Sequence, residues 1–189
     1  CCPFDAIGTT AATYAGQNLG AGKIDRVHQG VKAATLLGTI YSAAALVALF
    51  FTAKALSGLF LNPQDLDSAA RILPLARKML LYNAVFFIPL LFVNLLRFTI
   101  QGLGYSNLAT VAGVFEMIAR GLFALCLVPV GGFTAVCLSN PAAWVMADIF
   151  LFPAYYYCMK RRGFRCRKPA APILQEEAQP VLLTLKRGK

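Results

Sequence analysis

Long, continuous apolar stretches dominate the pattern along the chain. Four of them lie at residues 33–53, 79–96, about 105–130 and about 133–159. Each is close to the roughly 20 residues that a helix needs to cross about 30 Å of hydrocarbon. They are too continuous for a transmembrane β-strand, and lipid offers a non-helical backbone no hydrogen bonds. The pattern therefore predicts an all-α integral membrane protein with four complete transmembrane helices at about 31–53, 79–98, 105–130 and 133–159.

The remaining segments are predicted to differ from these spans. Residues 1–20 are too short and too polar to cross a membrane, begin without methionine and show no signal-peptide pattern. We interpret them as the end of a fifth, truncated transmembrane helix. A short amphipathic helix is predicted at residues 66–78, after the Asn62-Pro63 breaker. Residues 161–189 are predicted to form a basic, disordered cytoplasmic tail.

Composition agrees with a membrane protein, and the placement of charge predicts its orientation. Hydrophobic residues make up 58% of the chain and charged residues 14%, with a mean hydropathy of +0.63, whereas soluble domains carry charge on about a quarter of positions. Nine of the 18 basic residues follow Met159, and the predicted loop at residues 131–141 carries no charge. The positive-inside rule therefore predicts a cytoplasmic carboxyl terminus. No recognition motif accompanies the basic cluster, so no nucleic-acid partner is expected.

The sequence offers little from which to build a metal or cofactor site. It contains six cysteines without C-x-x-C spacing and a single histidine, His28. No phosphate-binding loop, cofactor motif or nucleophile and base set is visible. We therefore expect no metal, no cofactor and no enzymatic activity.

Five polar or charged residues inside the predicted spans are candidates for function. Glu116 and Arg120 are spaced i, i+4 and can neutralise each other, which matters because a lone charge near the bilayer centre costs at least ~2.5 kcal/mol. They form either a permanent structural pair or a polar element that faces a cavity. Asp148 has no basic residue at helical spacing in its span, so it is either a protonation site or bonded to another helix. Asn83 and Asn94 line a cavity or hydrogen-bond across helices.

The first glycine-containing segment predicts a helix end. Gly16 and Gly20 have the G-x-x-x-G spacing that lets a neighbouring backbone approach closely. Gln17 and Asn18 can bond the backbone groups that are freed where the helix ends.

A second such segment predicts a tight turn between two spans. Gln101, Gly102 and Gly104 are expected in this turn, with Arg97 as an anchor that reaches the lipid headgroups. Within the spans, Pro89 and Pro153 each remove a backbone donor and predict a kink.

These segments occur in an order that resembles a known family. GQNLGAGKIDRVHQG is followed by a span, then RFTIQGLGYSNLA, GVFEMIARG, a further span and NPAAWVMAD. This order is similar to the carboxyl-terminal lobe of MATE (multidrug and toxic compound extrusion) transporters. The residues that carry the family motifs are Gly16, Gln17, Asn18, Gly20, Ala21, Arg26, Arg97, Gln101, Gly102 and Gly104.

The resemblance implies a fold and a function. Family members have twelve helices in two lobes, and this chain would correspond to helices 8–12, a fragment whose partner is the missing amino-terminal lobe. The implied activity is multidrug efflux by antiport: export of cationic or amphipathic small molecules in exchange for protons or sodium across the plasma membrane. Two alternatives stay open, a lipid-linked oligosaccharide flippase of related fold and a non-transporting membrane subunit.

Overall fold

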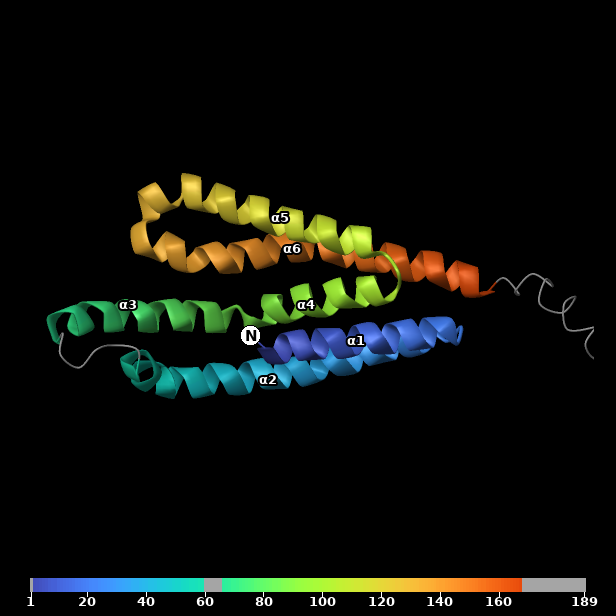
Figure 1. The fold of residues 1–189 in the computed structure, drawn as a ribbon, viewed down its shortest axis with the longest axis horizontal. Coiled ribbons are helices and arrows are strands. Elements are labelled where there is room, and N and C mark those ends of the chain that lie inside the picture. Colours follow the sequence, from blue (N-terminus) through green and yellow to red (C-terminus); the bar gives the residue numbers. More distant parts are fainter. Residues whose placement is uncertain (1, 60–65, 168–189) are drawn as a thin grey trace, which may run out of the picture.

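The computed structural model describes residues 2–59 and 66–167, and it places six helices in them (Figure 1). These are α1 (Cys2–Gly20), α2 (Ile24–Leu59), α3 (Leu66–Val85), α4 (Phe87–Gly102), α5 (Ser106–Cys126) and α6 (Val128–Arg167). The described residues include no strand. The predicted all-α fold is confirmed.

Three helical segments are long and apolar enough to cross a membrane. They are Ile24–Ala53, Ser106–Cys126 and Val128–Gly163. A fourth span is formed if Arg71–Val85 and Phe87–Gly102, which meet at a bend of 54°, are counted as one broken helix. The four spans that the sequence predicted therefore have counterparts in the structure, the second of them as a bent pair.

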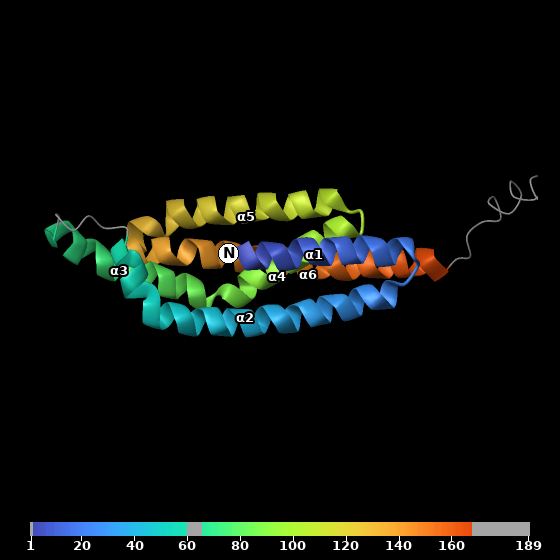
Figure 2. The same ribbon diagram turned by 60° about the horizontal axis from the view of Figure 1, so that its bottom comes forward.

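The helices share a long axis, and their directions alternate along the chain except that α3 and α4 run the same way, as the two halves of one bent span. In Figures 1 and 2 the α1–α2 turn, the α4–α5 turn and the carboxyl end of α6 lie at one end of the bundle, and the α5–α6 connection lies at the other. The central helix is α4, because it contacts each of the other five. It supplies much of the core, including Leu91, Leu95 and Ile100, whose side chains are fully buried. Large apolar side chains on α2 and α5 are exposed instead, as expected of surfaces that face lipid.

The bend between α3 and α4 follows from Pro89, as the sequence predicted. Proline has no N–H for the carbonyl of Val85, and its ring clashes with that carbonyl, so the helical hydrogen-bond ladder cannot continue. The N–H of Phe86 bonds instead to the carbonyl oxygen of Asn83, at 3.1 Å. The second span therefore breaks at Phe86, and its second half ends at Gly102 instead of residue 98.

The first span begins earlier than predicted. Helix α2 starts at Ile24, so Asp25 and Arg26 belong to its first turn. A carboxylate near a helix amino terminus interacts favourably with the exposed N–H groups, which allows the helix to continue past the apolar stretch. The helix has 36 residues, which at 1.5 Å per residue is more than the hydrocarbon thickness.

The last span also differs from its prediction. The backbone of Gly132, with φ 53° and ψ −141°, breaks α6 close to the predicted start of the span. Residues 133–141 are helical, in agreement with the predicted span at 133–159, and the overlapping prediction of a loop at residues 131–141 is wrong. The helix then runs to Arg167, so residues 161–167 are not part of a disordered tail. Lysine and arginine favour helix and suit a helix carboxyl end. Residues 168–189 of the predicted tail, and the Asn62-Pro63 breaker, lie outside the described residues.

Candidate functional site

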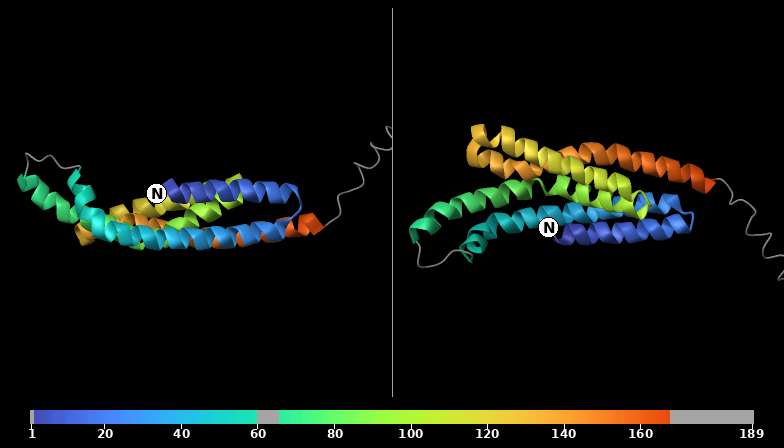
Figure 3. Two further views of the ribbon diagram at one scale, coloured as in Figure 1. Left: turned by 90° about the horizontal axis from the view of Figure 1, so that it is seen from below. Right: turned by 45° about the horizontal axis from the view of Figure 1, so that its top comes forward.

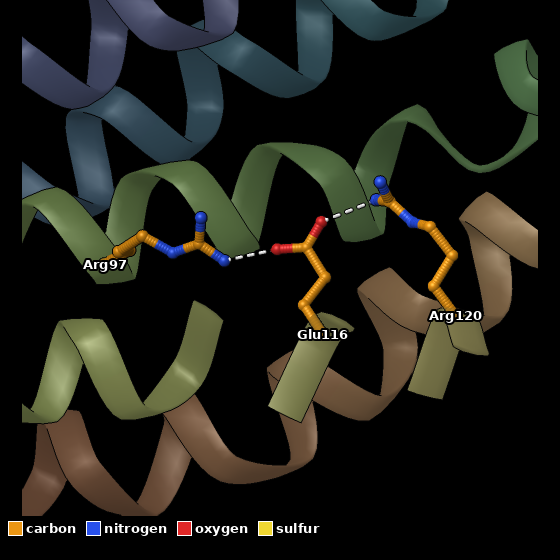
Figure 4. A network of polar contacts seen from close by, with 3 residues as sticks. All are labelled: Arg97, Glu116 and Arg120. Carbon is orange, nitrogen blue, oxygen red and sulfur yellow. Dashed lines mark hydrogen bonds and ion pairs between the residues drawn. The ribbon is translucent and has the colours of Figure 1, made fainter. Parts of the chain in front are cut away.

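A network of three charged side chains joins α4 to α5 in the apolar part of the bundle (Figure 4). Arg120 donates a hydrogen bond from Nη2 to Oε1 of Glu116 at 2.8 Å, the i, i+4 contact that the sequence predicted. Arg97 of α4 donates from Nη2 to Oε2 of the same carboxylate at 2.5 Å. Both carboxylate oxygens are therefore engaged, and Glu116 connects two arginines from different helices.

The two arginines are not equivalent. The side chains of Arg97 and Glu116 are 23% and 16% exposed, whereas Arg120 is 48% exposed. The expectation that Arg97 anchors to lipid headgroups is wrong, because its guanidinium points into the bundle toward Glu116 (Figure 4). An ion pair satisfies the charge of Arg97 inside the protein, where an isolated charge would be costly.

Asp148 of α6 lies close enough to Arg97 for their charges to attract each other. Its side chain is buried, and its Oδ1 atom has no hydrogen-bond partner. The Nε atom of Arg97 is likewise buried without a partner. The structure thus brings an acid from α6 to a network formed by α4 and α5. The network of Arg97, Glu116 and Arg120 carries one net positive charge, and an ionised Asp148 balances it.

The two asparagine candidates lie on either side of the bend in the second span. Asn83 is half-buried near the end of α3 and donates from Nδ2 to the carbonyl of Met79 at 2.9 Å, while its Oδ1 atom is buried without a partner. Asn94 is half-buried in α4. A break in a spanning helix with a free amide acceptor beside it is a polar point in an otherwise apolar segment.

The first glycine motif closes α1 with a Schellman turn. The N–H of Lys23 bonds to the carbonyl of Asn18 at 2.8 Å and that of Gly22 to the carbonyl of Leu19 at 3.0 Å. Gly22 has φ 71°, a conformation that favours glycine because it has no Cβ. The amide of Asn18 donates to the carbonyl of Tyr14 at 2.8 Å. Gln17, Gly20, Ala21 and Arg26 are exposed around this turn.

The second glycine motif repeats the same turn at the end of α4. Here the N–H of Tyr105 bonds to the carbonyl of Ile100 at 3.1 Å and that of Gly104 to the carbonyl of Gln101 at 2.8 Å, with Gly104 at φ 84°. Each turn therefore uses the second glycine of a G-x-G segment at the position after the helix end. Both turns lie at the same end of the bundle (Figure 3).

The two motifs also meet, because α1 packs on α4. A Cβ on Gly102 would overlap the backbone of Ala12, and one on Gly16 would lie 3.5 Å from the carbonyl oxygen of Gly102. The sequence predicted that Gly16 and Gly20 both let a neighbouring backbone approach. This prediction is wrong for Gly20, because no atom of the described residues lies within 4 Å of its Cβ position. The partner of Gly16 is a glycine of another helix, 86 positions on in the sequence.

Arg162 is a residue that the sequence did not single out. It donates from Nη2 to the carbonyl of Leu103 at 2.7 Å and lies over the ring of Tyr105, at 4.9 Å from the ring centroid. These contacts tie α6 to the α4–α5 turn. No sequence signal separates Arg162 from its basic neighbours, because its role depends on a carbonyl 59 positions away.

The fold and these contacts define a class of protein. Several helices are long and apolar enough to cross a membrane, and charged side chains lie between them, with Arg97, Glu116 and Arg120 paired and Asp148 buried without an ion pair in the part of the chain that the structure describes. Within the described residues, His, Cys, Asp and Glu side chains form no group of three that could hold a metal ion.

Comparison with known proteins gives the family. The MatE family model matches residues 3–126, about two-thirds of the chain, which includes α1 through α5 but not Asp148 or Arg162. The chain therefore belongs to the MatE family of membrane transporters, and the resemblance seen in the sequence is confirmed. No curated protein and no solved structure gives a significant match.

Proposed function

We propose that the chain is part of a secondary active antiporter that exports cationic or amphipathic small molecules in exchange for protons or sodium ions. The observation that carries the proposal is the match to the MatE family across α1 through α5. Family membership supports membrane transport. The substrate class and the coupling ion are further steps, and they rest on the resemblance and on the acids inside the bundle.

Asp148 is the residue that we propose for ion coupling. Its carboxylate is buried near the middle of a spanning helix and has an oxygen without a hydrogen-bond partner. Arg97, the nearby counter-charge, is shared with Glu116. When Arg97 moves toward Glu116, Asp148 needs a proton or a metal cation to balance its charge, and when Arg97 moves toward Asp148 that cation is released. The alternative is that the carboxylate only holds α4 and α6 together.

The other candidates have supporting roles in this proposal. Asn83 and Asn94 contribute polar groups to the substrate pathway on either side of the 54° bend. Arg120 neutralises Glu116 when Arg97 leaves it, which lets Arg97 change partners. The bend between α3 and α4 allows their halves to move relative to each other, as secondary transporters with broken helices do.

The orientation and partners complete the proposal. Basic residues such as Lys23, Arg26 and Arg161 lie at the bundle end that holds the carboxyl terminus of α6, which supports a cytoplasmic location for this end in the plasma membrane. A transporter of this design moves two lobes around a site between them. The proposed partners are therefore the bilayer, an amino-terminal lobe, the small-molecule substrate and the coupling cation.

The test is transport in vesicles. The chain is purified in mild detergent from the cell that makes it, together with any protein that it assembles with, and reconstituted. We expect efflux of the cationic dye ethidium that depends on a proton or sodium gradient. Asp148→Asn should abolish the coupling, and Asp25→Asn, the same substitution at an exposed helix end, should not. Gradient-independent movement of a lipid-linked oligosaccharide would favour the flippase, and no movement of either compound would favour a non-transporting subunit.

A further inference from the structure

Helix α1 exposes a row of polar side chains along one face. Asp5, Thr9, Thr13 and Gln17 are spaced four residues apart, and all four are exposed. Residues at this spacing share one side of a helix. The opposite side, with Phe4, Gly8, Ala11 and Ala15, is buried against the bundle.

The aromatic contacts of Phe4 place the start of this row near the middle of the membrane. The ring centroid of Phe4 lies 5.3 Å from that of Tyr41 and 5.4 Å from that of Phe87. Tyr41 lies in the central part of Ile24–Ala53, and Phe87 adjoins the break halfway along the bent span. The amino end of α1 correspondingly lies beside the junction of α3 and α4 (Figures 1 and 3). Asp5, the next residue, is therefore far from both bundle ends.

An exposed carboxylate at this depth does not suit a lipid-facing surface, because hydrocarbon solvates neither its charge nor its polar neighbours. Among the described residues no basic group forms an ion pair with Asp5. The neighbouring α2 presents a different surface, since Leu36, Leu37 and Ile40 are exposed there at a similar level of the bundle. The α1 row is thus suited to water, and the α2 surface is suited to lipid.

A groove between α1 and α2 adjoins the polar row. It has a volume of about 610 Å³, within the range of small-molecule sites. Thr10, Tyr14 and Gln29 supply polar groups to its lining, and apolar side chains such as Ile7 and Val31 supply the rest. The lining is mostly apolar and, among the described residues, contains no charged residue, so it suits the apolar body of an organic cation and leaves the charge to the neighbouring row.

We propose that the row of Asp5, Thr9, Thr13 and Gln17 lines a water-filled pathway, and that Asp5 attracts cationic compounds into it. This surface would be part of the transport pathway, so the inference rests on the proposed function. Its accessibility to water, however, can be measured without any transport, so the two proposals can fail separately.

The test uses single cysteines in the full chain, with the native cysteines replaced, in the membrane of the cell that makes the protein. Thr9→Cys and Thr13→Cys are the test positions. Ile40→Cys is the matched control, because it is exposed at a similar depth on an apolar face. Each is treated with a cationic methanethiosulfonate, the trimethylammonium-ethyl reagent, and with an anionic one, the sulfonatoethyl reagent. Both need water and an ionised thiol to react.

We expect Thr9→Cys and Thr13→Cys to react with both reagents at least about tenfold faster than Ile40→Cys. Asp5→Asn should lower the ratio of cationic to anionic reaction rates at Thr9→Cys by about three- to tenfold, and by less at Thr13→Cys, since the charge acts over roughly 6 Å at the first position and about twice that at the second. Asp5→Glu should retain the ratio.

Two results would overturn the proposal. Reaction of Thr9→Cys and Thr13→Cys as slow as that of Ile40→Cys would show that lipid or a dry protein interface covers the row. Fast reaction with a rate ratio that Asp5→Asn leaves unchanged would show a wet pathway in which Asp5 does not attract cations. If dye transport fails in vesicles but the labelling result holds, the proposed antiport is wrong and the water-filled surface stands.

Discussion

Replacing Arg97 by glutamine should destabilise the protein much more than the same replacement of Arg120, although both arginines bind one carboxylate. Arg97 reaches Glu116 from another helix and is 23% exposed, whereas Arg120 lies one turn away on the same helix and is 48% exposed. Loss of Arg97 therefore removes a link between α4 and α5 and leaves Glu116 and Asp148 without their interior counter-charge.

The magnitude follows from the burial of each pair. Removing one partner of a fully buried ion pair costs about 3–5 kcal/mol. Arg97 and Glu116 are only mostly buried, so Arg97→Gln should lower the free energy of unfolding by about 2–3 kcal/mol. Arg120→Gln should lower the free energy of unfolding by no more than about 1 kcal/mol, as expected of an exposed i, i+4 pair. The coupling energy between Arg97 and Glu116 should be about 1–2 kcal/mol.

The assay is a pair of double-mutant cycles on purified protein in bicelles, one for Arg97 with Glu116 and one for Arg120 with Glu116. Each uses glutamine substitutions and measures the free energy of unfolding with added denaturing detergent. Arg120→Gln is the internal control, because it removes the same type of charge from the same carboxylate. Equal losses for the two arginines, or additive losses for Arg97 and Glu116, would refute the reasoning.

Two further predictions concern packing and orientation. Gly102→Ala should lower the free energy of unfolding by about 1–3 kcal/mol, because its Cβ would overlap the backbone of Ala12. Gly121→Ala, at a helical position with no atom within 4 Å, should be neutral or stabilising by up to about 1 kcal/mol; thermal unfolding of the two variants compares them, and equal shifts would contradict the packing. In a background without native cysteines, Lys23→Cys and the 91% exposed Val130→Cys should be labelled from opposite sides of the membrane by an impermeant maleimide. Labelling of both from one side would contradict the orientation of the helices.

The sequence by itself determined the class of protein and local features such as the membrane spans and the bend before Pro89. Spans are readable because crossing hydrocarbon demands an uninterrupted apolar stretch, which is a property of neighbouring residues. The bend before Pro89 is readable for the same reason, since proline acts on a carbonyl four positions away. The motif order predicted the family, which the MatE match confirms. The apolar pattern could not locate the helix ends, because it marks where the hydrocarbon ends and a helix can continue beyond that point. Helices α2 and α6 both extend beyond the predicted spans.

Only the tertiary structure decided which polar groups meet. Arg97 binds a carboxylate 19 positions away on another helix, and its charge acts on Asp148, 51 positions away. Periodicity within a helix cannot supply such pairs, because they depend on how whole helices pack and rotate against each other. The same holds for Asp5, whose position near mid-membrane is set by the contacts of Phe4 with two other helices. Its sequence neighbourhood, short and polar, predicted only the end of a helix.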